Sequence, residues 1–273
     1  MATWLITGTS SGLGRALAEQ AARAGHQVAA TARDSGTIRD LVDACPGRVA
    51  AIDLDVTDAA SRAAAVAAAQ ERFGGIDVLV NNAGYGYTAA IEEGEDDAVA
   101  VLFATNFTGP VALIKAVLPG MRERRAGLII NISSIGARAT LAGGGYYSAA
   151  KAALEGASGA LRREVAPFGI RVMVVEPGSF RTAFRGQSAK RSRIRIPDYD
   201  EVLGRDGSPR LGPQRGDPRK AAKAILAAAA KPAPPALLLL GSDALEGHRT
   251  VTHAEQADIE QHLQLSRSTD ATD

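Results

Sequence analysis

Short runs of aliphatic and β-branched residues alternate with longer alanine-rich stretches along most of this 273-residue chain. The short runs read as seven strands, at residues 3–7, 27–32, 49–54, 76–81, 127–133, 170–176 and 236–240. Amphipathic helical patterns lie between them, at residues 12–24, 58–73, 97–118, 146–167 and 218–230. This alternation indicates βαβ units and a parallel sheet. Right-handed crossovers place helices on both faces, so we predict one α/β domain, residues 1–273, built as a doubly wound sandwich.

Two segments depart from this alternation. Residues 183–215 contain scattered glycine, proline and serine, and they carry an excess of arginine: Arg185, Arg191, Arg193, Arg195, Arg205, Arg210 and Arg215. Such a segment is either a solvated flexible loop or a substrate lid over a site. The polar residues 266–273 are predicted to form a disordered tail.

The charge balance limits the classes of partner. Lys and Arg number 31 against 30 Asp and Glu, so no net field would attract nucleic acid or an anionic membrane. Cys45 is the only cysteine and the four histidines fall in no motif, so no disulfide and no metal site is predicted. No signal-peptide pattern is present, and the apolar runs at residues 221–230 and 236–240 are too short to span a bilayer. We therefore predict a cytoplasmic protein.

A glycine-rich turn follows the first predicted strand. The stretch LITGTSSGLG, residues 5–14, places Gly8, Gly12 and Gly14 between that strand and the first helix. Glycines there permit positive φ and close backbone approach, and a helix N-terminus offers free N–H groups to a pyrophosphate. The spacing differs from G-x-G-x-x-G and from the P-loop pattern. Taken alone, the turn is either a nucleotide site or a tight strand-to-helix connection.

Further motifs follow in order, and together they resemble those of the short-chain dehydrogenase/reductase family. They are Thr7-Gly8-x-x-x-Gly12-x-Gly14, Asp55-Val56, Asn81-Asn82-Ala83-Gly84, Asn106 in N-F-x-G, Ser134 closing NISS, Tyr147-x-x-x-Lys151, and Pro177-Gly178 with Thr182. The resemblance covers residues 3–182 in detail. It implies a compact Rossmann-type oxidoreductase that interconverts an alcohol and a carbonyl compound. The stretches TWLITGTSSGLG, TARD and VEPGSFRT are most similar to the hydroxysteroid and retinol dehydrogenase branch, which implies a lipophilic substrate.

The candidate catalytic residues are Ser134, Tyr147, Lys151 and Asn106. Tyr147 and Lys151 are four residues apart on a predicted helix and share one face, whereas Tyr146 lies about 140° away from Lys151 around the helix. Carbonyl reduction builds negative charge on oxygen and needs a proton donor there. We expect a nearby ammonium and the positively charged nicotinamide ring to favour tyrosinate and so to lower the pKa of Tyr147, which is ordinarily about 10. The resemblance implies that Ser134 binds the substrate oxygen and that the backbone of Asn106 supports a proton relay to Lys151.

The resemblance also implies where the cofactor binds. The implied contacts are Gly8, Ser10, Ser11, Gly12, Leu13, Gly14, Arg33, Asp55, Val56, Asn82, Ala83, Gly84, Tyr147, Lys151, Pro177, Gly178 and Thr182. Lys151 in particular would bind the nicotinamide ribose hydroxyls.

The end of the second strand bears on the choice between NADP(H) and NAD(H). An acid there holds the ribose hydroxyls of NAD, and a basic residue accommodates the 2′-phosphate of NADP. The family position of the acid is Ala32, and Arg33 follows it. A guanidinium suits a phosphate in both charge and geometry. Asp34 lies two places beyond and is interpreted as a helix cap, so we predict NADP(H), with NAD(H) as the alternative.

Other interpretations stay open. A nucleotide-binding regulatory protein of the same fold would need no proton donor, and the presence of Ser134, Tyr147 and Lys151 argues against it. An epimerase or dehydratase of the extended branch would need a different glycine spacing. The resemblance implies a homodimer or homotetramer that uses the helices at residues 97–118 and 146–167. The sequence does not specify the substrate.

Overall fold

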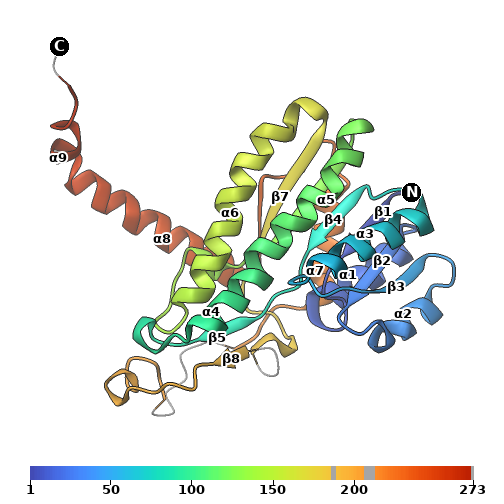
Figure 1. Ribbon diagram of the computed structural model, residues 1–273. Helices are drawn as coiled ribbons and strands as arrows, with labels where there is room; N and C mark the ends of the chain where they lie inside the picture. The colour runs from blue at the N-terminus through green and yellow to red at the C-terminus, as the bar shows by residue number, and fades with distance from the viewer. Residues whose placement is uncertain (186–188, 206–212, 272–273) are drawn as a thin grey trace.

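The computed structural model describes residues 1–185, 189–205 and 213–271, and its centre is a seven-stranded parallel sheet (Figure 1). The strand order is β3-β2-β1-β4-β6-β7-β9. The strands are β1 (Thr3–Ile6), β2 (Gln27–Ala32), β3 (Val49–Asp53), β4 (Val78–Asn81), β6 (Gly127–Ile132), β7 (Ile170–Pro177) and β9 (Leu237–Leu240). The predicted fold class is confirmed.

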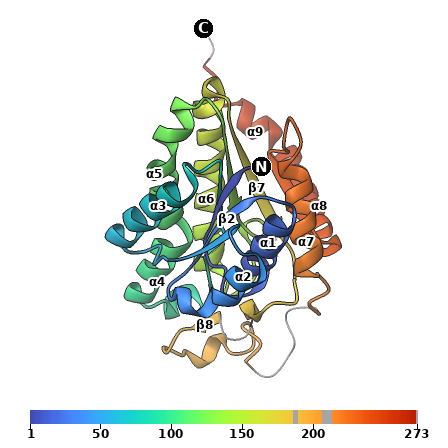
Figure 2. The same cartoon turned by 90° about the vertical axis from the view of Figure 1, so that its right-hand side faces the viewer.

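Each strand divides its side chains between two hydrophobic cores, one on each face of the sheet. In β1, Trp4 and Ile6 belong to the first core and Leu5 to the second. The first core is covered by α1 (Gly12–Arg23), α2 (Arg39–Ala44) and α7 (Pro218–Ala229), and the second by α3 (Ala59–Phe73), α5 (Gly109–Glu123) and α6 (Gly145–Val165). Figure 2 shows α1 and α7 on one side of the sheet and α3 and α5 on the other. This alternation is what a parallel sheet buried on both faces requires.

Helix ends follow the local signals in the sequence. The carboxylate of Asp58 accepts a hydrogen bond of 2.6 Å from Ser61 N at the start of α3, and Gly74, with φ of +80°, ends that helix. At the start of α7, the carboxylate of Asp217 accepts a bond of 2.8 Å from Arg219 N, and Pro218 occupies the first helical position.

The helix expected at residues 97–118 is longer and is interrupted. It consists of α4 (Asp96–Phe103), a π-helical segment (Ala104–Thr108) and α5. By length and composition alone, residues 96–123 could cross a membrane. The apolar runs identified from the sequence, at residues 221–230 and 236–240, are shorter and do not include this stretch. In this fold the stretch packs against α3, α6 and the sheet.

Other elements were not predicted from the sequence. They are a 3₁₀ turn (Ser35–Ile38) leading into α2, the paired strands β5 (Gly86–Thr88) and β8 (Ala189–Arg191), α8 (Ser242–Gln261) and α9 (Leu263–Arg267). Ala244 is buried, but the side chains beyond Val251 are exposed, so α8 has little apolar periodicity. Figure 1 shows α8 and α9 extending away from the sheet. The helix α9 reaches into the expected disordered tail, of which residues 272–273 lie outside the described residues.

The strand order reverses between β1 and β4. The chain moves outward from β1 through β2 to β3 and then returns to place β4 on the other side of β1. In open α/β sheets, ligands bind at the carboxyl ends of the strands at this kind of switch point. The glycine turn follows β1 and the Asn82-Ala83-Gly84 segment follows β4, so both lie at this edge.

Candidate active site

The glycine turn leaves the N-terminus of α1 open. Gly8 and Gly12 adopt φ of +70° and +60°, which glycine tolerates best. Ser11 precedes the helix and makes no side-chain capping bond within the described part of the chain, and no acid lies in the first turn. A methyl added to Gly12 would lie 3.4 Å from Thr182, so the segment after β7 faces this turn. The free N–H groups form a site suited to an anion.

Asn82 fastens the glycine turn to the end of β4. Its Nδ2 donates to the carbonyls of Thr7, at 2.8 Å, and Gly8, at 3.1 Å. The hydroxyl of Thr7 accepts a bond of 2.8 Å from Ala83 N. A methyl on Gly14 would lie 2.3 Å from Asn82 Nδ2 and 2.4 Å from Gly8 O. These contacts therefore hold the conformation of the glycine turn. They involve Gly8, Gly14, Asn82 and Ala83.

Ser134, Tyr147 and Lys151 come together from β6 and α6. The side chain of Ser134, which follows β6, interacts with Tyr147 and acts to lower its pKa. The buried Lys151 ammonium donates to Ile132 O at 2.8 Å and lies 5.9 Å from the centroid of the Tyr147 ring. Tyr146 instead donates its hydroxyl to Ile91 O at 2.6 Å. The helical spacing therefore selects the tyrosine that shares a cluster with Ser134 and Lys151.

The pKa of Tyr147 differs from the expectation. Burial raises the pKa of Tyr147 to about 12, and the side chain of Ser134 acts in the opposite direction. Burial also lowers the pKa of Lys151 to about 8, with the charge of Glu155 opposing that change. For the protein chain by itself, the pKa of Tyr147 is therefore raised, because desolvation of the tyrosinate outweighs the polar contacts. The predicted lowering, which also depends on the nicotinamide ring, stays a prediction.

Asn106 and Gly84 complete the wall beside Lys151. Asn106 is buried in the π-helical segment, where its Oδ1 accepts from Tyr85 N at 3.1 Å and its Nδ2 donates to Tyr85 O at 2.9 Å. A methyl on Gly84 would lie 2.8 Å from Asn106 Oδ1 and 3.4 Å from Lys151 Nζ. The structure thus brings Gly84, Asn106 and Lys151 to one place.

The ends of β2 and β3 form the other end of the site. Arg33 is exposed, and its charge contributes to lowering the pKa of Asp55, after the larger effect of the hydrogen bonds that Thr57 donates. Asp34 caps the 3₁₀ turn by accepting from Gly36 N at 2.8 Å, which confirms its interpretation as a cap. Asp53 likewise accepts from Ser35 N at 2.7 Å. Backbone N–H groups thus bind one oxygen of each of these two carboxylates.

The remaining predicted contacts lie along the same edge. Ser10 and Ser11 are exposed on the glycine turn, whereas Leu13 packs against the first core. Val56 is buried and its carbonyl accepts from Arg62 at 2.7 Å. Gly178, which follows Pro177, donates its N–H to Leu240 O at 2.9 Å.

Sequence reasoning missed an aromatic neighbour of Tyr147, the candidate catalytic tyrosine. The rings of Phe184 and Tyr147 lie 5.7 Å apart between centroids, within the range of favourable aromatic pairs. Phe184 belongs to residues 183–215, a polar segment in which Phe184 and Tyr199 are the aromatic residues and were the available signal.

Part of the segment 183–215 is anchored by ion pairs. Arg205 pairs with the buried Glu93 at 2.5 Å, and this contact lowers the pKa of Glu93 to about 2. Arg193 pairs with Glu95 at 2.7 Å and Arg195 with Asp200 at 2.5 Å. Residues 186–188 and 206–212, with Arg210, lie outside the described residues.

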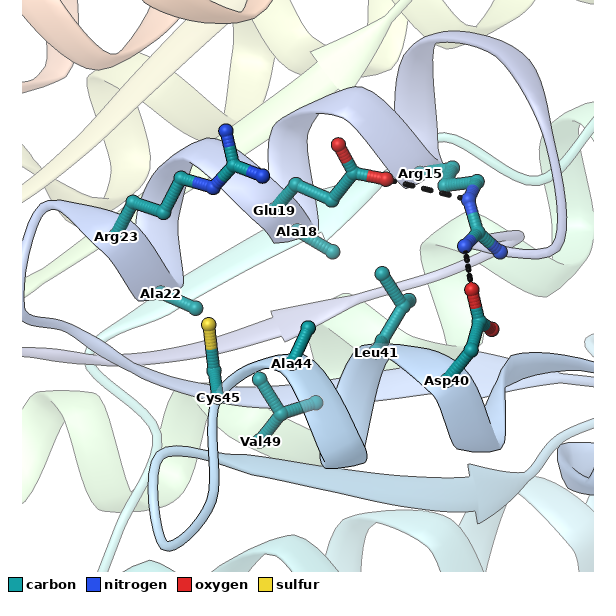
Figure 3. Close-up of a pocket in the computed structure, with 10 residues that line it drawn as sticks. All are labelled: Arg15, Ala18, Glu19, Ala22, Arg23, Asp40, Leu41, Ala44, Cys45 and Val49. Atoms are coloured by element: carbon teal, nitrogen blue, oxygen red, sulfur yellow. Dashed lines mark hydrogen bonds and ion pairs between the residues drawn. The ribbon is translucent and has the colours of Figure 1, made fainter.

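A separate pocket lies between α1 and α2 (Figure 3). Arg15 bridges Glu19 and Asp40 at one end of it, and Cys45 lies near the other. None of the predicted site residues is among those that line this pocket, so it is not the site formed at the strand ends.

The switch point, the open helix N-terminus and the Ser134, Tyr147 and Lys151 cluster define the class of the protein: a Rossmann-type, dinucleotide-dependent oxidoreductase. The family model for short chain dehydrogenases matches residues 2–193. The chain belongs to the short-chain dehydrogenase family, and it is an enzyme that acts on alcohol and carbonyl groups with a nicotinamide cofactor.

Relatives match the chain along most of its length. Oxidoreductase BOA17 of Botryotinia fuckeliana is 38% identical over 270 residues, which are 96% of this chain and 97% of that protein. Human retinol dehydrogenase 8 is 40% identical over 207 residues, which are 72% of this chain and 65% of that protein.

Solved structures share the fold. A Streptomyces avermitilis short-chain dehydrogenase has a TM-score of 0.93 and 44% identity, covering 99% of this chain and 100% of that one. A Burkholderia cenocepacia short chain dehydrogenase in complex with NADP has a TM-score of 0.73 and 27% identity, covering 95% and 96% of the two chains. A Brucella melitensis 3-ketoacyl-(acyl-carrier-protein) reductase complexed with NADH has a TM-score of 0.75 and 26% identity, covering 89% and 97%.

Proposed function

We propose that this enzyme interconverts a lipophilic alcohol and its ketone or aldehyde with NADP(H), using Tyr147 as general acid and base. The observation that carries the proposal is the cluster of Tyr147, Ser134 and Lys151 beside an open helix N-terminus. A nicotinamide dinucleotide fits this edge, because the first turn of α1 offers free N–H groups to a pyrophosphate and Gly84 leaves the approach to Lys151 clear.

Each residue has a distinct part in the reaction. The bound nicotinamide supplies or accepts a hydride. Ser134 donates a hydrogen bond to the substrate oxygen, and Tyr147 gives that oxygen a proton during reduction or takes one during oxidation. Lys151 holds the ribose hydroxyls, and its ammonium favours tyrosinate when substrate displaces water from the cluster. Asn106 stabilises the π-helical backbone that faces Lys151 and supports the proton relay.

The preference for NADP(H) rests on Arg33. Its guanidinium is exposed at the end of β2, whereas the carboxylates of Asp34 and Asp53 accept backbone hydrogen bonds. An exposed basic group suits a 2′-phosphate better than ribose hydroxyls, and Asp55, the acid on which the charge of Arg33 acts, already accepts hydrogen bonds from Thr57. One related structure is a complex with NADP and another is a complex with NADH, so members of the family bind either cofactor.

Exposed apolar residues near the start of α6 support a lipophilic substrate. Ile91 and Leu141 are 68% and 53% exposed, and Ile91 lies against Gly145 at the start of the helix that carries Tyr147. Arg193, Arg195 and Arg205 already pair with acids of this chain, so they are poorly placed to bind an acidic substrate. The similarity to retinol dehydrogenase 8 agrees with a lipophilic substrate.

Replacement of Tyr147 tests the reaction. We expect Tyr147→Phe to lower kcat for a probe pair such as 2-octanol and 2-octanone by at least about 10²-fold, because the proton donor is lost. Binding of NADPH, followed by fluorescence, should remain. Tyr146→Phe is the matched control and should keep most of its activity. Unchanged turnover in Tyr147→Phe would refute the mechanism and favour the second candidate, a regulatory nucleotide-binding protein.

Replacement of Arg33 tests the cofactor. Arg33→Ala should lower kcat/KM with NADPH by about 10- to 100-fold and leave that with NADH nearly unchanged, since a charge-assisted contact to phosphate contributes about 1.5–3 kcal/mol. Arg163→Ala, at an exposed position of α6, is the control. A preference of the unmodified enzyme for NADH would overturn this part of the proposal.

We further propose a homodimer or homotetramer that uses α4, α5 and α6. The outer face of α6 presents the small exposed residues Ala149, Ala152 and Gly156, which permit close helix approach. Sedimentation of the protein, with Ala152→Arg as the disrupting variant, tests this interface. The cytoplasmic location remains a prediction.

A further inference from the structure

Two glutamates lie together behind the catalytic cluster. Glu155 is on α6, one turn beyond Lys151, and its side chain is 14% exposed. Glu176 is near the end of β7 and its side chain is fully buried. The two carboxyl groups lie against the same guanidinium, that of Arg138, and the charge of Glu176 acts on Glu155. Two neighbouring carboxyl groups can share a hydrogen bond when one of them holds a proton.

Each carboxyl group also contacts the loop that carries Ser134. Glu155 Oε1 accepts a hydrogen bond of 2.5 Å from the hydroxyl of Ser133, the residue before Ser134. Glu176 Oε1 accepts from Arg138 Nε at 3.3 Å, and the same Nε lies 3.7 Å from Glu155 Oε2. Ser133 and Arg138 therefore attach the chain on both sides of Ser134 to the carboxyl pair.

Two more titratable groups face the pair. His248 of α8 places its Nδ1 3.9 Å from Glu176 Oε2, and neither atom has a hydrogen-bond partner among the described residues. Lys151 is the nearest cation on α6, and the charge of Glu155 favours its protonated form. The groups that face the pair are thus Arg138 from the loop after β6, His248 from α8 and Lys151 from α6.

The electrostatics agree with a shared proton near neutral pH. Burial raises the pKa of Glu155 to about 7, and the charge of Glu176 acts in the same direction. The hydrogen bond from Ser133 and the charge of Arg138 oppose that rise. Arg138 is the cation that forms ion pairs with both carboxyl groups in the described part of the chain, so a second negative charge there is costly at acidic and neutral pH.

We propose that Glu155 and Glu176 form a proton-sharing pair that positions Ser133 and Ser134 and, through the charge of Glu155, controls the charge on Lys151. Glu155 is thus a positioning residue that makes the reaction rate depend on pH. This inference rests on the proposed function, in which Ser134 and Lys151 act on the substrate and cofactor.

Glu155→Gln tests the proposal, because glutamine imitates the protonated side chain. Near pH 5.5 the variant should oxidise 2-octanol with kcat/KM within about twofold of the unmodified enzyme. Near pH 8.5 its kcat/KM should be about tenfold lower, which corresponds to a change of about one unit in the pKa that Lys151 controls. Glu164→Gln, an exposed position on the same helix, is the control. A loss of equal size at every pH would show a merely structural role and overturn the proposal.

Infrared titration of the free enzyme gives a readout that needs no substrate. Protein labelled with ¹³C-glutamate should show a protonated-carboxyl band that disappears near pH 7 and is missing from Glu155→Gln. Ser133→Ala should move that transition to higher pH, and Glu176→Gln to lower pH, because the first removes a hydrogen bond to the carboxylate and the second removes a like charge. An unmoved transition in both variants would overturn the pair. Failure of Tyr147→Phe to lose activity would instead overturn the proposed function and leave this titration readable.

Discussion

Gly14→Ala adds a single methyl group at the point where the glycine turn meets the end of β4. The methyl would lie 2.3 Å from Asn82 Nδ2 and 2.4 Å from Gly8 O, well inside ordinary contact. Alanine gains at most about 1 kcal/mol over glycine in a helix. Displacement of Asn82 loses two hydrogen bonds of about 1 kcal/mol each, and overpacking costs about 1–3 kcal/mol. We expect the free energy of unfolding to fall by about 2–4 kcal/mol.

Urea unfolding followed by the fluorescence of Trp4 measures this change, since Trp4 is buried in β1 beside the turn. Gly156→Ala is the matched helical control in the monomer, where no described heavy atom lies within 4 Å of its added methyl, so it should stabilise the monomer by about 0.5–1 kcal/mol. Because Gly156 lies on the proposed interface, the comparison is made on monomeric protein. Both variants are compared with the unmodified protein in the same oligomeric state.

A double-mutant cycle separates the cost of the lost Asn82 hydrogen bonds from the cost of the steric clash. Asn82→Ala loses the hydrogen bonds without the clash, and in the double variant Gly14→Ala should cost less because the side chain it meets is gone. The contact with Gly8 O remains, so some cost persists. A Gly14→Ala variant as stable as the unmodified protein, with NADPH affinity unchanged, would refute the argument that glycine is required there for close approach.

Three further outcomes are expected. The folded-state pKa of Glu155 lies above its usual value, so its carboxylate destabilises the fold as pH rises from about 4.5 through about 7. The increase in the free energy of unfolding caused by Glu155→Gln, measured by urea unfolding, should therefore be about 1–2 kcal/mol larger at pH 8.5 than at pH 5. Lys151 has a lowered pKa, so its charge opposes folding below about pH 8; Lys151→Met should raise the free energy of unfolding at pH 7 by about 1–2 kcal/mol while activity is lost. Arg205→Gln leaves Glu93 without its cation, so limited proteolysis should cut residues 189–205 several-fold faster than in Arg191→Gln, and equal rates would contradict an anchoring role.

The strongest sequence signals concerned periodicity and local chemistry. Strand runs with side chains buried on both faces, caps such as Asp58 and Asp217, and the four-residue spacing of Tyr147 and Lys151 depend on near neighbours in the chain, and the structure matches them. The glycine turn was recognisable for the same reason. The structure adds the role of Gly14, which depends on Asn82 from a distant strand.

Features that depend on distant packing could not be read from the sequence. The pKa of Tyr147 follows burial, which no spacing reports. Glu155 and Glu176 are 21 positions apart, and their pairing follows from the placement of α6 against β7. The helix α8 was not predicted, because most of its second half is exposed and lacks the apolar periodicity that marks a helix packed against a core.

The π-helical segment Ala104–Thr108 amounts to one extra residue inside an otherwise continuous helix. Gly109, just beyond it, lies so close to Val56 O that an added methyl would approach to 2.5 Å, so α5 keeps its place against the turn after β3. Deleting one residue from the segment would restore regular α-helical hydrogen bonding while rotating Asn106 away from Tyr85. Regular helical hydrogen bonding and the Asn106–Tyr85 contacts are therefore opposed at this segment, so a chain shortened there should form a more regular helix and lose those contacts.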